Sequence, residues 1–361
     1  MIYRAIGIMS GSSLDGLDIA YVVFEETGGR WNYEIITAEC ASYSADWAEK
    51  LYRATALSAL DYQLLHTEYG HYIGENINRF IAANNLAHKV HLIASHGHTT
   101  FHLPQKKMSA QLGDGAAIAA VTQLPVISDL RSLDVAFGGQ GAPIVPIGHK
   151  LLFNEYDCFL NIGGIANISL KQDEKNIAFD ICPANRVLNM LVAEKGLLYD
   201  DEGKIAAMGN VNEKLLQQLN ELEYYMQPFP KSLPNSFGMD IILPMIRNAS
   251  LSTEDALRTY VEHIAIQISR SFQNIQHSTS NLKLLVTGGG AFNSFLIERL
   301  SYMLDHVEIV VPEKKIVEYK EALIMALIGV LRWREEVNVL SSVTGASQNS
   351  IGGALWIGNT D

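Results

Sequence analysis

The sequence predicts an α/β protein made of two lobes with a cleft between them. Short apolar runs of β-forming residues alternate with longer helical patterns, which is typical of sheets covered by helices. Each half also opens with a strand, a glycine-containing turn and a second strand, over residues 2–24 and 158–170. Because the halves repeat an architecture, they indicate two similar lobes, and ligands commonly bind in the cleft between lobes.

The composition excludes several classes of protein. The 361 residues are enough for two domains, and 48% hydrophobic with 18% charged residues excludes a disordered chain. The 27 Lys and Arg against 39 Asp and Glu give a net charge of −12, the opposite sign to that of a non-specific nucleic-acid binder. Any anion must therefore be bound locally, by backbone N–H groups or a metal.

The cysteines and the N-terminal residues indicate that the protein is located in a reducing compartment. Cys40, Cys158 and Cys182 show no CxxC spacing, so we expect neither a disulfide framework nor a structural zinc site. Residues 1–9 are too short and too broken for a signal peptide, and we find no apolar run long enough to span a membrane. These features predict a cytoplasmic protein that binds neither membranes nor nucleic acid.

The expected elements follow from periodicity and capping. Strands are predicted at 2–9, 17–24, 31–37, 90–94, 125–127, 158–162, 165–170, 176–180, 282–286 and 307–311, and helices at 59–83, 114–121, 319–333, from about 185 and from 252. Ser58 with Asp61, and Ser252 with Asp255, have the spacing of helix-capping boxes. The proline-containing stretch 227–244 is predicted to be irregular.

Three glycine turns are candidates for phosphate binding. They occupy residues 11–18, 161–167 and 287–293. Glycine lets the backbone approach a ligand, and turn N–H groups can hold an anion. Asp15 could hold a hydrated Mg²⁺ ion. The alternative for each turn is an ordinary hairpin or loop with no ligand. A P-loop and a dinucleotide-binding fingerprint are both absent from the sequence.

Asp180 is the candidate general base. It follows the apolar residue Phe179 at the predicted end of a strand, where a carboxylate facing a cleft can accept a proton. A second interpretation, which the spacing alone slightly favours, is that Asp180 caps the helix that follows.

Polar residues elsewhere also allow two interpretations each. Arg131 could clamp a carboxylate or phosphate, or pair locally with Asp129 or Asp134. Glu321 could face the cleft or favour the first turn of its helix. The histidines at 96, 98 and 102 invite a zinc site, but hydrogen-bonding roles are favoured because no partner pattern completes the site.

Taken in order, these motifs resemble those of the anhydro-N-acetylmuramic acid kinases, within the superfamily of sugar kinases, heat-shock chaperones and actin ATPases. The matching motifs span nearly the whole chain: residues 7–18, 95–97, 111–115, 129–134, 138–143, 161–167, 287–293, 320–322, 344–347 and 352–354.

The resemblance implies a fold and a division of the chain. Each lobe is expected to be a ribonuclease-H-like α/β unit. The first lobe would hold residues 1–131 with 341–361, and the second residues 132–340. The resemblance further implies ATP and Mg²⁺ as cofactors and a homodimer as the assembly.

The resemblance also implies site residues. The first phosphate-binding hairpin would comprise Gly11, Ser12, Ser13, Leu14, Asp15, Gly16, Leu17 and Asp18, with Asp15 and Asp18 holding the metal. The second would use Asn161, Gly163, Gly164 and Asn167, and Gly288, Gly289 and Gly290 would lie against the adenosine. Asp180 would be the catalytic base, and Arg131, Glu321, His96 and Asn185 would contact the substrate.

The implied reaction is the ATP-dependent opening of 1,6-anhydro-N-acetylmuramic acid with phosphorylation of O6, giving N-acetylmuramic acid 6-phosphate in murein recycling. The chain departs from the family pattern at Ile181–Cys182, where Thr-Gly is usual, and at His98, where Gln is usual. Residues 231–236 depart from the pattern as well. Two alternatives therefore stay open: a kinase of another amino sugar, and a non-catalytic, nucleotide-gated regulator of the same fold.

Overall fold

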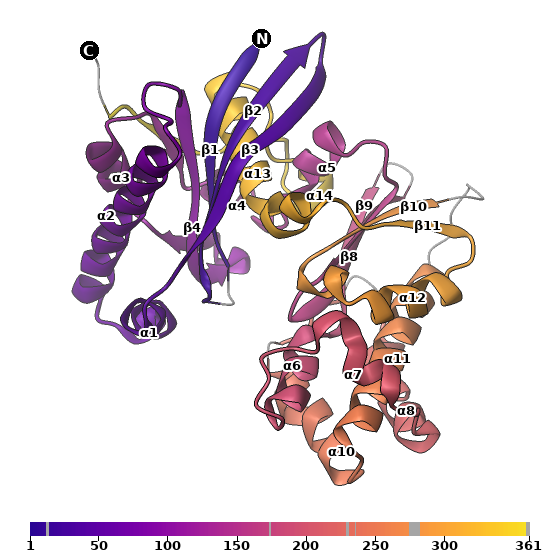
Figure 1. Cartoon of the computed structure of the whole chain (residues 1–361). Coiled ribbons are helices and arrows are strands. Elements are labelled where there is room, and N and C mark those ends of the chain that lie inside the picture. Colours follow the sequence, from indigo (N-terminus) through magenta and orange to yellow (C-terminus); the bar gives the residue numbers. More distant parts are fainter. Residues whose placement is uncertain (12–13, 173–174, 229–230, 235, 274–281, 359–361) are drawn as a thin grey trace. The chain divides into compact units, whose positions relative to one another are not determined.

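The chain forms two compact units. A computed structural model describes residues 1–11, 14–172, 175–228, 231–234, 236–273 and 282–358. Unit 1 contains Met1–Asn154 and Tyr319–Asp361, and unit 2 contains Glu155–Glu318 (Figure 1).

The sheet of unit 1 is built on an antiparallel meander. β1 (Ile2–Ser10), β2 (Gly16–Thr27) and β3 (Arg30–Ser42) pair in succession. On the other side of β1 lie β4 (Leu92–Leu103) and β6 (Val126–Ser128), both in parallel pairing. β12 (Ala354–Trp356) closes that side in antiparallel pairing with β6, and β5 (Met108–Leu112) pairs with β4.

The sheet of unit 2 repeats this order. β7 (Cys158–Ile162), β8 (Ile165–Gln172) and β9 (Lys175–Pro183) form the meander. β10 (Leu282–Thr287) pairs in parallel with β7, and β11 (Val307–Val310) pairs in parallel with β10. Across each sheet, the third, second and first strands of the meander lie in that order, and two parallel strands follow beside the first. The predicted fold class, α/β with a repeated architecture, is therefore confirmed.

Helices cover both sheets. Those of unit 1 are α1 (Ala45–Arg53), η1 (Ala54–Ala56), α2 (Ala59–Ala83), η2 (Pro104–Lys106), α3 (Gly115–Thr122), α4 (Ser132–Ala136), α5 (Pro146–Leu152) and α14 (Ser341–Thr344). Those of unit 2 are α6 (Asn185–Ala193), η3 (Asp201–Gly203), α7 (Lys204–Met208), α8 (Glu213–Asn220), α9 (Glu223–Met226), η4 (Gly238–Ile242), α10 (Leu243–Asn248), α11 (Thr253–Gln273), η5 (Gly289–Phe292) and α12 (Ser294–Met303). α13 (Lys314–Trp333) belongs to both units.

Several local predictions are confirmed at the level of single hydrogen bonds. Ser58 Oγ accepts from the Asp61 N–H at 3.2 Å, and Ser252 Oγ accepts from the Asp255 N–H at 3.1 Å, so both predicted caps begin their helices. The irregular stretch is correctly predicted at 227–228 and 231–234, but 238–248 is helical.

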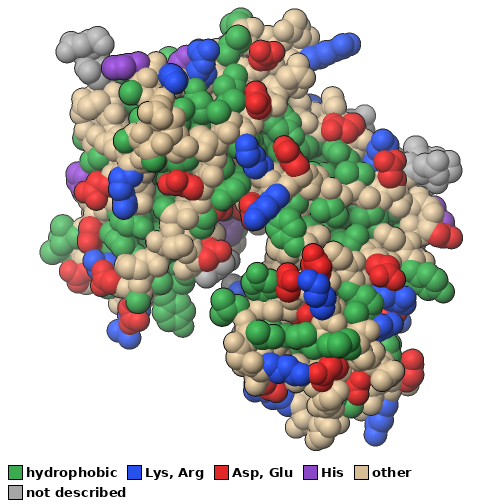
Figure 2. Space-filling view, in the orientation of Figure 1, with side chains coloured by type: hydrophobic (Ala, Val, Ile, Leu, Met, Phe, Trp, Pro, Cys, Tyr) green, Lys and Arg blue, Asp and Glu red, His purple; other side chains and the backbone are tan. Residues whose placement is uncertain are grey.

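Each unit has its own apolar core. In unit 1, residues of β1 and β2 such as Ile8 and Ile19 pack with Ile73 and Ile77 of α2, all fully buried. In unit 2, Leu160 of β7 belongs to a buried cluster with Ile264 and other residues of α11. No helix in the described part of the chain is both long and apolar enough to cross a membrane. Figure 2 shows acidic and basic side chains interspersed over the face that it draws.

The unit bounds differ from the lobe bounds expected from the sequence. Residues 132–154 and 319–340 belong to unit 1 and not, as expected, to the second lobe. Packing explains the difference, because Gly148 of α5 lies directly against Ile324 of α13. Buried Asp134 also accepts a hydrogen bond from Thr344 Oγ1 at 2.6 Å. The unit boundary falls where α13 is kinked, at Tyr319 (φ −117°, ψ 15°).

The approach of α13 to β1 predicts a stability effect. A Cβ atom at Gly7 would lie 1.9 Å from the Ala322 carbonyl oxygen. Gly7→Ala must therefore push α13 off the sheet, and overpacking of this kind costs about 1–3 kcal/mol. Urea unfolding measures the loss. Gly164→Ala is the control, because Gly164 has no positive φ and the nearest atom to a Cβ there lies 3.6 Å away. Equal losses in the two variants would contradict the packing argument.

Candidate functional site

The first glycine turn joins β1 to β2. The two strands stay paired up to Ser10 and Leu17, and Asp18 lies opposite Met9. Of the predicted turn residues, Ser12 and Ser13 lie outside the described residues. Gly11 is half-buried, Asp15 is exposed and Asp18 is half-buried.

Two residues of this turn show why its conformation is specific. Leu14 has a left-handed φ of 58°, which is uncommon for a residue with a side chain, and its side chain packs against the core of unit 1. Gly16 is required by packing, because a Cβ atom would lie 2.5 Å from Cys40 Sγ. Asp15 Oδ1 accepts from the Gly16 N–H at 3.0 Å.

A hydroxyl network holds the base of the turn. Ser10 Oγ lies 2.8 Å from the Tyr43 hydroxyl and 3.0 Å from His98 Nδ1. Tyr43 also bonds the buried Tyr69 hydroxyl at 2.5 Å. Burial lowers the pKa of His98, so its ring is favoured in the neutral form. His98, which stands where the family usually has Gln, thus makes a hydrogen bond at the start of the predicted phosphate-binding turn.

His96 and Arg131 form a second polar group in unit 1. Arg131 Nε donates to His96 Nε2 at 2.9 Å, and Arg131 Nη1 donates to the Gly141 carbonyl at 3.1 Å. His96 Nδ1 lies 2.8 Å from the Gly97 carbonyl, so the ring carries its proton on Nδ1. Burial, followed by the Arg131 charge, lowers the pKa of His96 to about 3. A neutral imidazole therefore orients the guanidinium.

The alternative pairing of Arg131 with Asp129 or Asp134 is wrong. Asp129 accepts from Ser132 Oγ, and Asp134 accepts from the Gly141 N–H and from Thr344. Burial lowers the pKa of Arg131 to about 10, while the Glu321 charge acts in the opposite direction. Glu321 is exposed and near enough to Arg131 to interact with its charge. The structure thus brings His96, Arg131 and Glu321 together.

Polar residues of unit 2 form a row across its sheet. Asn161 of β7 lies opposite Asn167 of β8, and Asn167 lies opposite Asp180 of β9. Thr287 of β10 pairs with Asn161 on the other side. Paired residues of neighbouring strands project on the same side of a sheet. The row therefore places the candidate base beside both asparagines of the second turn.

The second turn leaves room above its glycines. The nearest atoms to a Cβ at Gly163 or Gly164 would be 3.6 Å away, and neither residue has a positive φ. Their carbonyls accept from the N–H groups of Asn185 and Ala184 at the start of α6. Packing within unit 2 does not require glycine at these positions, whereas close approach of a ligand would.

The third turn packs directly on the second. At Gly288, with φ 81°, a Cβ atom would lie 2.5 Å from Asn161 Oδ1, and at Gly290 it would lie 2.2 Å from Ile162 Cγ2. Asn185 Nδ2 donates to the Ile162 carbonyl at 3.0 Å. The structure therefore brings together the predicted residues of both turns and Asn185. Gly289 is exposed, and a Cβ atom added there would lie 3.4 Å from Asn185 Nδ2.

Asp180 lies at a β-bulge inside β9 and not at the end of the strand. Asn167 pairs with Asp180 and Ala166 with Cys182, so Ile181 is the additional residue. The helix-cap interpretation is wrong, because Ala184 is the N-cap of α6. Asp180 Oδ2 instead accepts from the Leu233 N–H at 2.9 Å. Burial raises the pKa of Asp180, and the Leu233 hydrogen bond opposes that rise.

Sequence reasoning missed the residues that hold Asp180. The Tyr224 hydroxyl donates to the Asp180 carbonyl at 2.6 Å, and the Asp180 N–H donates to the Lys231 carbonyl at 3.0 Å. The sequence signals were the irregular stretch from 227 and the departure from the family pattern over 231–236, and neither reveals these contacts.

Cys182, at one of the positions where the chain departs from the family pattern, lies in the core of unit 2. Its side chain is fully buried in the apolar cluster of unit 2, and burial raises the pKa of its thiol. The residue therefore packs against the core and is an inert thiol.

The carboxylates of the first turn fit a hydrated magnesium ion. The described residues contain no group of three or more His, Cys, Asp or Glu that could hold a metal. His96, His98 and His102 each lie at hydrogen-bond distance from an oxygen atom. Mg²⁺ needs only one or two carboxylates because it keeps most of its waters. Asp15 and Asp18 can supply these, and Asp15 is open to solvent.

Comparison with known proteins identifies the family. The model of a family described as anhydro-N-acetylmuramic acid kinase matches residues 3–358. The chain belongs to the anhydro-N-acetylmuramic acid kinase family. Its curated relatives include proteins of that name from Aliivibrio fischeri, 35% identical over 83% of this chain and 84% of the relative, and from Vibrio vulnificus, 32% identical over 97% of each.

Solved structures show only a loose likeness. An activator of 2-hydroxyisocaproyl-CoA dehydratase from Clostridium difficile, with bound ADPNP, is 15% identical with a TM-score of 0.44. It covers 92% of this chain and 96% of its own. Family membership therefore rests on the sequence match.

The His96 pKa predicts how stability depends on pH. Because the pKa falls from 6.5 to about 3 on folding, the unfolded chain binds the proton more tightly. The contribution of neutral His96 to the free energy of unfolding is therefore fully present above pH 6.5 and is lost as the pH falls toward 3. His96→Gln should therefore lose about 3 kcal/mol less than the wild type between pH 7.5 and 4.5. Urea unfolding at both pH values measures this difference, and identical losses would contradict the neutral imidazole.

Proposed function

We propose that this chain is an ATP-dependent kinase that opens 1,6-anhydro-N-acetylmuramic acid and phosphorylates O6, giving N-acetylmuramic acid 6-phosphate. Family membership across residues 3–358 supports the reaction class. The arrangement of Asp180 supports the chemistry, because a half-buried carboxylate of raised pKa lies in one row with Asn161 and Asn167.

The substrate dictates an unusual kinase reaction. O6 of a 1,6-anhydro sugar is bonded to the anomeric carbon, so no free hydroxyl exists there to be phosphorylated. Asp180 takes a proton from water, and the water oxygen bonds to the anomeric carbon as the bond from that carbon to O6 breaks. O6 then bonds to the γ-phosphorus of ATP, and ADP leaves. Water, sugar and ATP thus give the ring-opened 6-phosphate, ADP and a proton.

Asp180 is suited to the first step. Burial raises its pKa and makes the carboxylate a stronger base, while the hydrogen bond from the Leu233 N–H favours the ionised form and opposes that rise. No group in the described part of the chain donates to Oδ1. Oδ1 is therefore the oxygen that we assign to the proton.

The glycine turns are assigned to ATP. Residues 11–18 and the turn with Asn161, Gly163, Gly164 and Asn167 would bind phosphates, and Gly288–Gly290 would lie against the adenosine. The open space above Gly163 and Gly164 supports this assignment. Asp15 and Asp18 would hold Mg²⁺, which when bound neutralises charge on the phosphoryl group.

The polar group of unit 1 is assigned to the sugar. Arg131 presents a charged guanidinium held by neutral His96, and Glu321 adds an exposed carboxylate. A guanidinium suits the carboxylate of a muramic acid, and a carboxylate can accept from sugar hydroxyls. Asn185, beside the glycine turns, is assigned a substrate contact as well.

The direct test is a turnover assay with the purified protein, Mg·ATP and 1,6-anhydro-N-acetylmuramic acid. Sugar-dependent ADP release with a 6-phosphorylated, ring-opened product supports the proposal. Nucleotide binding without such turnover would favour a different amino sugar or a regulatory role. Cytoplasmic location and a homodimer stay predictions.

Asp180→Asn should keep nucleotide binding and lose turnover. The amide keeps the size of the side chain but cannot accept the proton, and general-base catalysis contributes about 10²–10⁴-fold. Coupled ADP assays and calorimetric titration with a non-hydrolysable ATP analogue measure the two properties. Asp305→Asn, at an exposed position of unit 2, is the control. Turnover near wild type in Asp180→Asn would refute the base assignment.

The glycines of the second and third turns should respond differently to alanine. Gly163→Ala has room for its Cβ and should leave the melting temperature unchanged while weakening ATP binding about tenfold. Gly290→Ala meets Ile162 and should lower the melting temperature as well. Thermal melts with nucleotide titrations separate the two effects. Unchanged ATP affinity in Gly163→Ala would remove the second turn from the nucleotide site.

A further inference from the structure

A segment made of residues 224–228 and 231–233 fixes the position of Asp180 from outside the sheet. Among the described strands, β9 is the last of its sheet, so one of its edges is not paired with another strand. Three hydrogen bonds join that edge to the segment at a single residue: Tyr224 hydroxyl to the Asp180 carbonyl, Asp180 N–H to the Lys231 carbonyl, and Leu233 N–H to Asp180 Oδ2. Backbone and carboxylate are thus held by the same segment.

Tyr224 is itself firmly placed. Its side chain is buried, and its ring lies 5.6 Å from that of Phe237. Lys231 Nζ donates to the Tyr224 carbonyl at 3.0 Å and lies 4.5 Å above the Tyr224 ring. Burial and the charge of Asp180 raise the pKa of Tyr224, so the phenol remains a donor at neutral pH. Tyr224 therefore links both ends of the segment to the Asp180 backbone.

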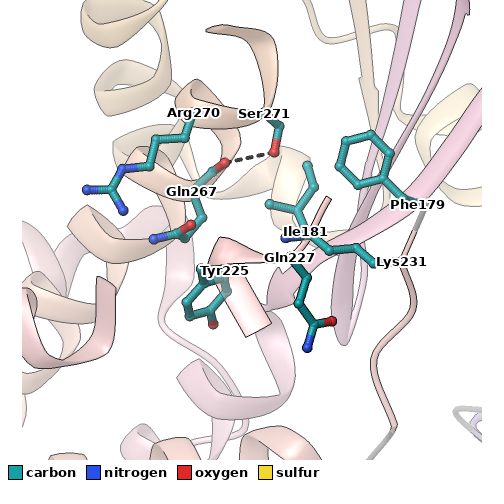
Figure 3. A pocket seen from close by; sticks show the side chains of 8 residues that line it. All are labelled: Phe179, Ile181, Tyr225, Gln227, Lys231, Gln267, Arg270 and Ser271. Atoms are coloured by element: carbon teal, nitrogen blue, oxygen red, sulfur yellow. Dashed lines mark hydrogen bonds between the residues drawn. The ribbon is translucent and has the colours of Figure 1, made fainter. Parts of the chain in front are cut away.

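Side-chain packing between the segment and β9 is incomplete at one place. A cavity of about 30 Å³ is lined by Phe179 and Ile181 of β9, by Tyr225, Gln227 and Lys231 of the segment, and by residues of α11 (Figure 3). Such a volume holds about one water molecule. Beside this cavity, the hydrogen bonds at Asp180 add to the packing of Tyr224 and Leu233 in holding the segment against β9.

We propose that Tyr224 is a positioning residue for the general base: its hydrogen bond to the Asp180 carbonyl keeps the segment in place so that the Leu233 N–H holds Oδ2 and leaves Oδ1 to take the proton. The inference rests on the proposed role of Asp180. It assigns no contact with the substrate to Tyr224.

The test uses two neighbouring tyrosines. Tyr224→Phe removes only the hydroxyl that binds Asp180. Tyr225→Phe is the matched control, because its hydroxyl lies 3.0 Å from His263 Nε2. Each variant removes one hydrogen-bond partner from a buried group, so a general loss of stability should be similar in both and is measured by thermal melts.

Tyr224→Phe should lower kcat about 5–10-fold, the effect of losing roughly one hydrogen bond, with the KM for ATP within about twofold of wild type. In Tyr224→Phe the Leu233 hydrogen bond is weakened, so it opposes less the rise that burial causes in the pKa of Asp180. The acid limb of the pH profile of kcat should therefore move up by about half a pH unit. Lys231 and Cys182 are ionisable groups that interact with Tyr224, and both are unchanged in the two variants. Tyr225→Phe should leave kcat and the acid limb as in the wild type.

The outcomes separate this inference from the proposed function. An inactive Asp180→Asn with wild-type kcat and pH profile in Tyr224→Phe would overturn the role of Tyr224 alone. Equal losses of kcat in Tyr224→Phe and Tyr225→Phe would overturn it too. An active Asp180→Asn would instead remove the base assignment. NMR titration of the Asp180 carboxyl, labelled with ¹³C, needs no turnover: its pKa should rise in Tyr224→Phe, and an unchanged value counts against the proposal.

Discussion

The close approach of one backbone to another determines the site of unit 2. β10 runs parallel to β7, and the chain that leaves β10 must pass directly over the end of β7. Gly288 and Gly290 allow this passage because no Cβ atom fits beside Asn161 and Ile162. With that contact in place, α6 begins against the Gly163 and Gly164 carbonyls, and the row from Asn161 to Asp180 has a fixed position.

In unit 1, the feature that must be held in place is a charged side chain, that of Arg131. Arg131 is largely withdrawn from water, so the N–H groups of its guanidinium need acceptors that the protein places in advance. A protonated His96 would repel it, and burial prevents that protonation. The Gly141 carbonyl accepts a second hydrogen bond, and Asp134 holds the Gly141 N–H. The orientation of Arg131 thus depends on a loop that a buried carboxylate fixes.

The sequence predicted local structure well because its signals are local. The meanders, the capping boxes and the glycine turns each depend on residues a few positions apart. The environment of Asp180 was not predictable, since Tyr224 and Leu233 lie 44 and 53 positions further along the chain. The lobe bounds expected from the sequence differ from the unit bounds for the same reason: the place of α5 depends on Ile324, which no local pattern connects to Gly148. Arg131 and His96, 35 positions apart, show the same limit.

The hydrogen bond between Asp180 and Lys231 has a consequence for solubility. β9 is an edge strand, and an uncovered edge can pair with a strand of another molecule. The Lys231 carbonyl occupies that edge at the bulge, where the Asp180 N–H would otherwise be available. Substitutions that release Lys231 would therefore expose a template for intermolecular strand pairing. Resistance to aggregation is thus a second property, besides the position of Asp180, that depends on this contact.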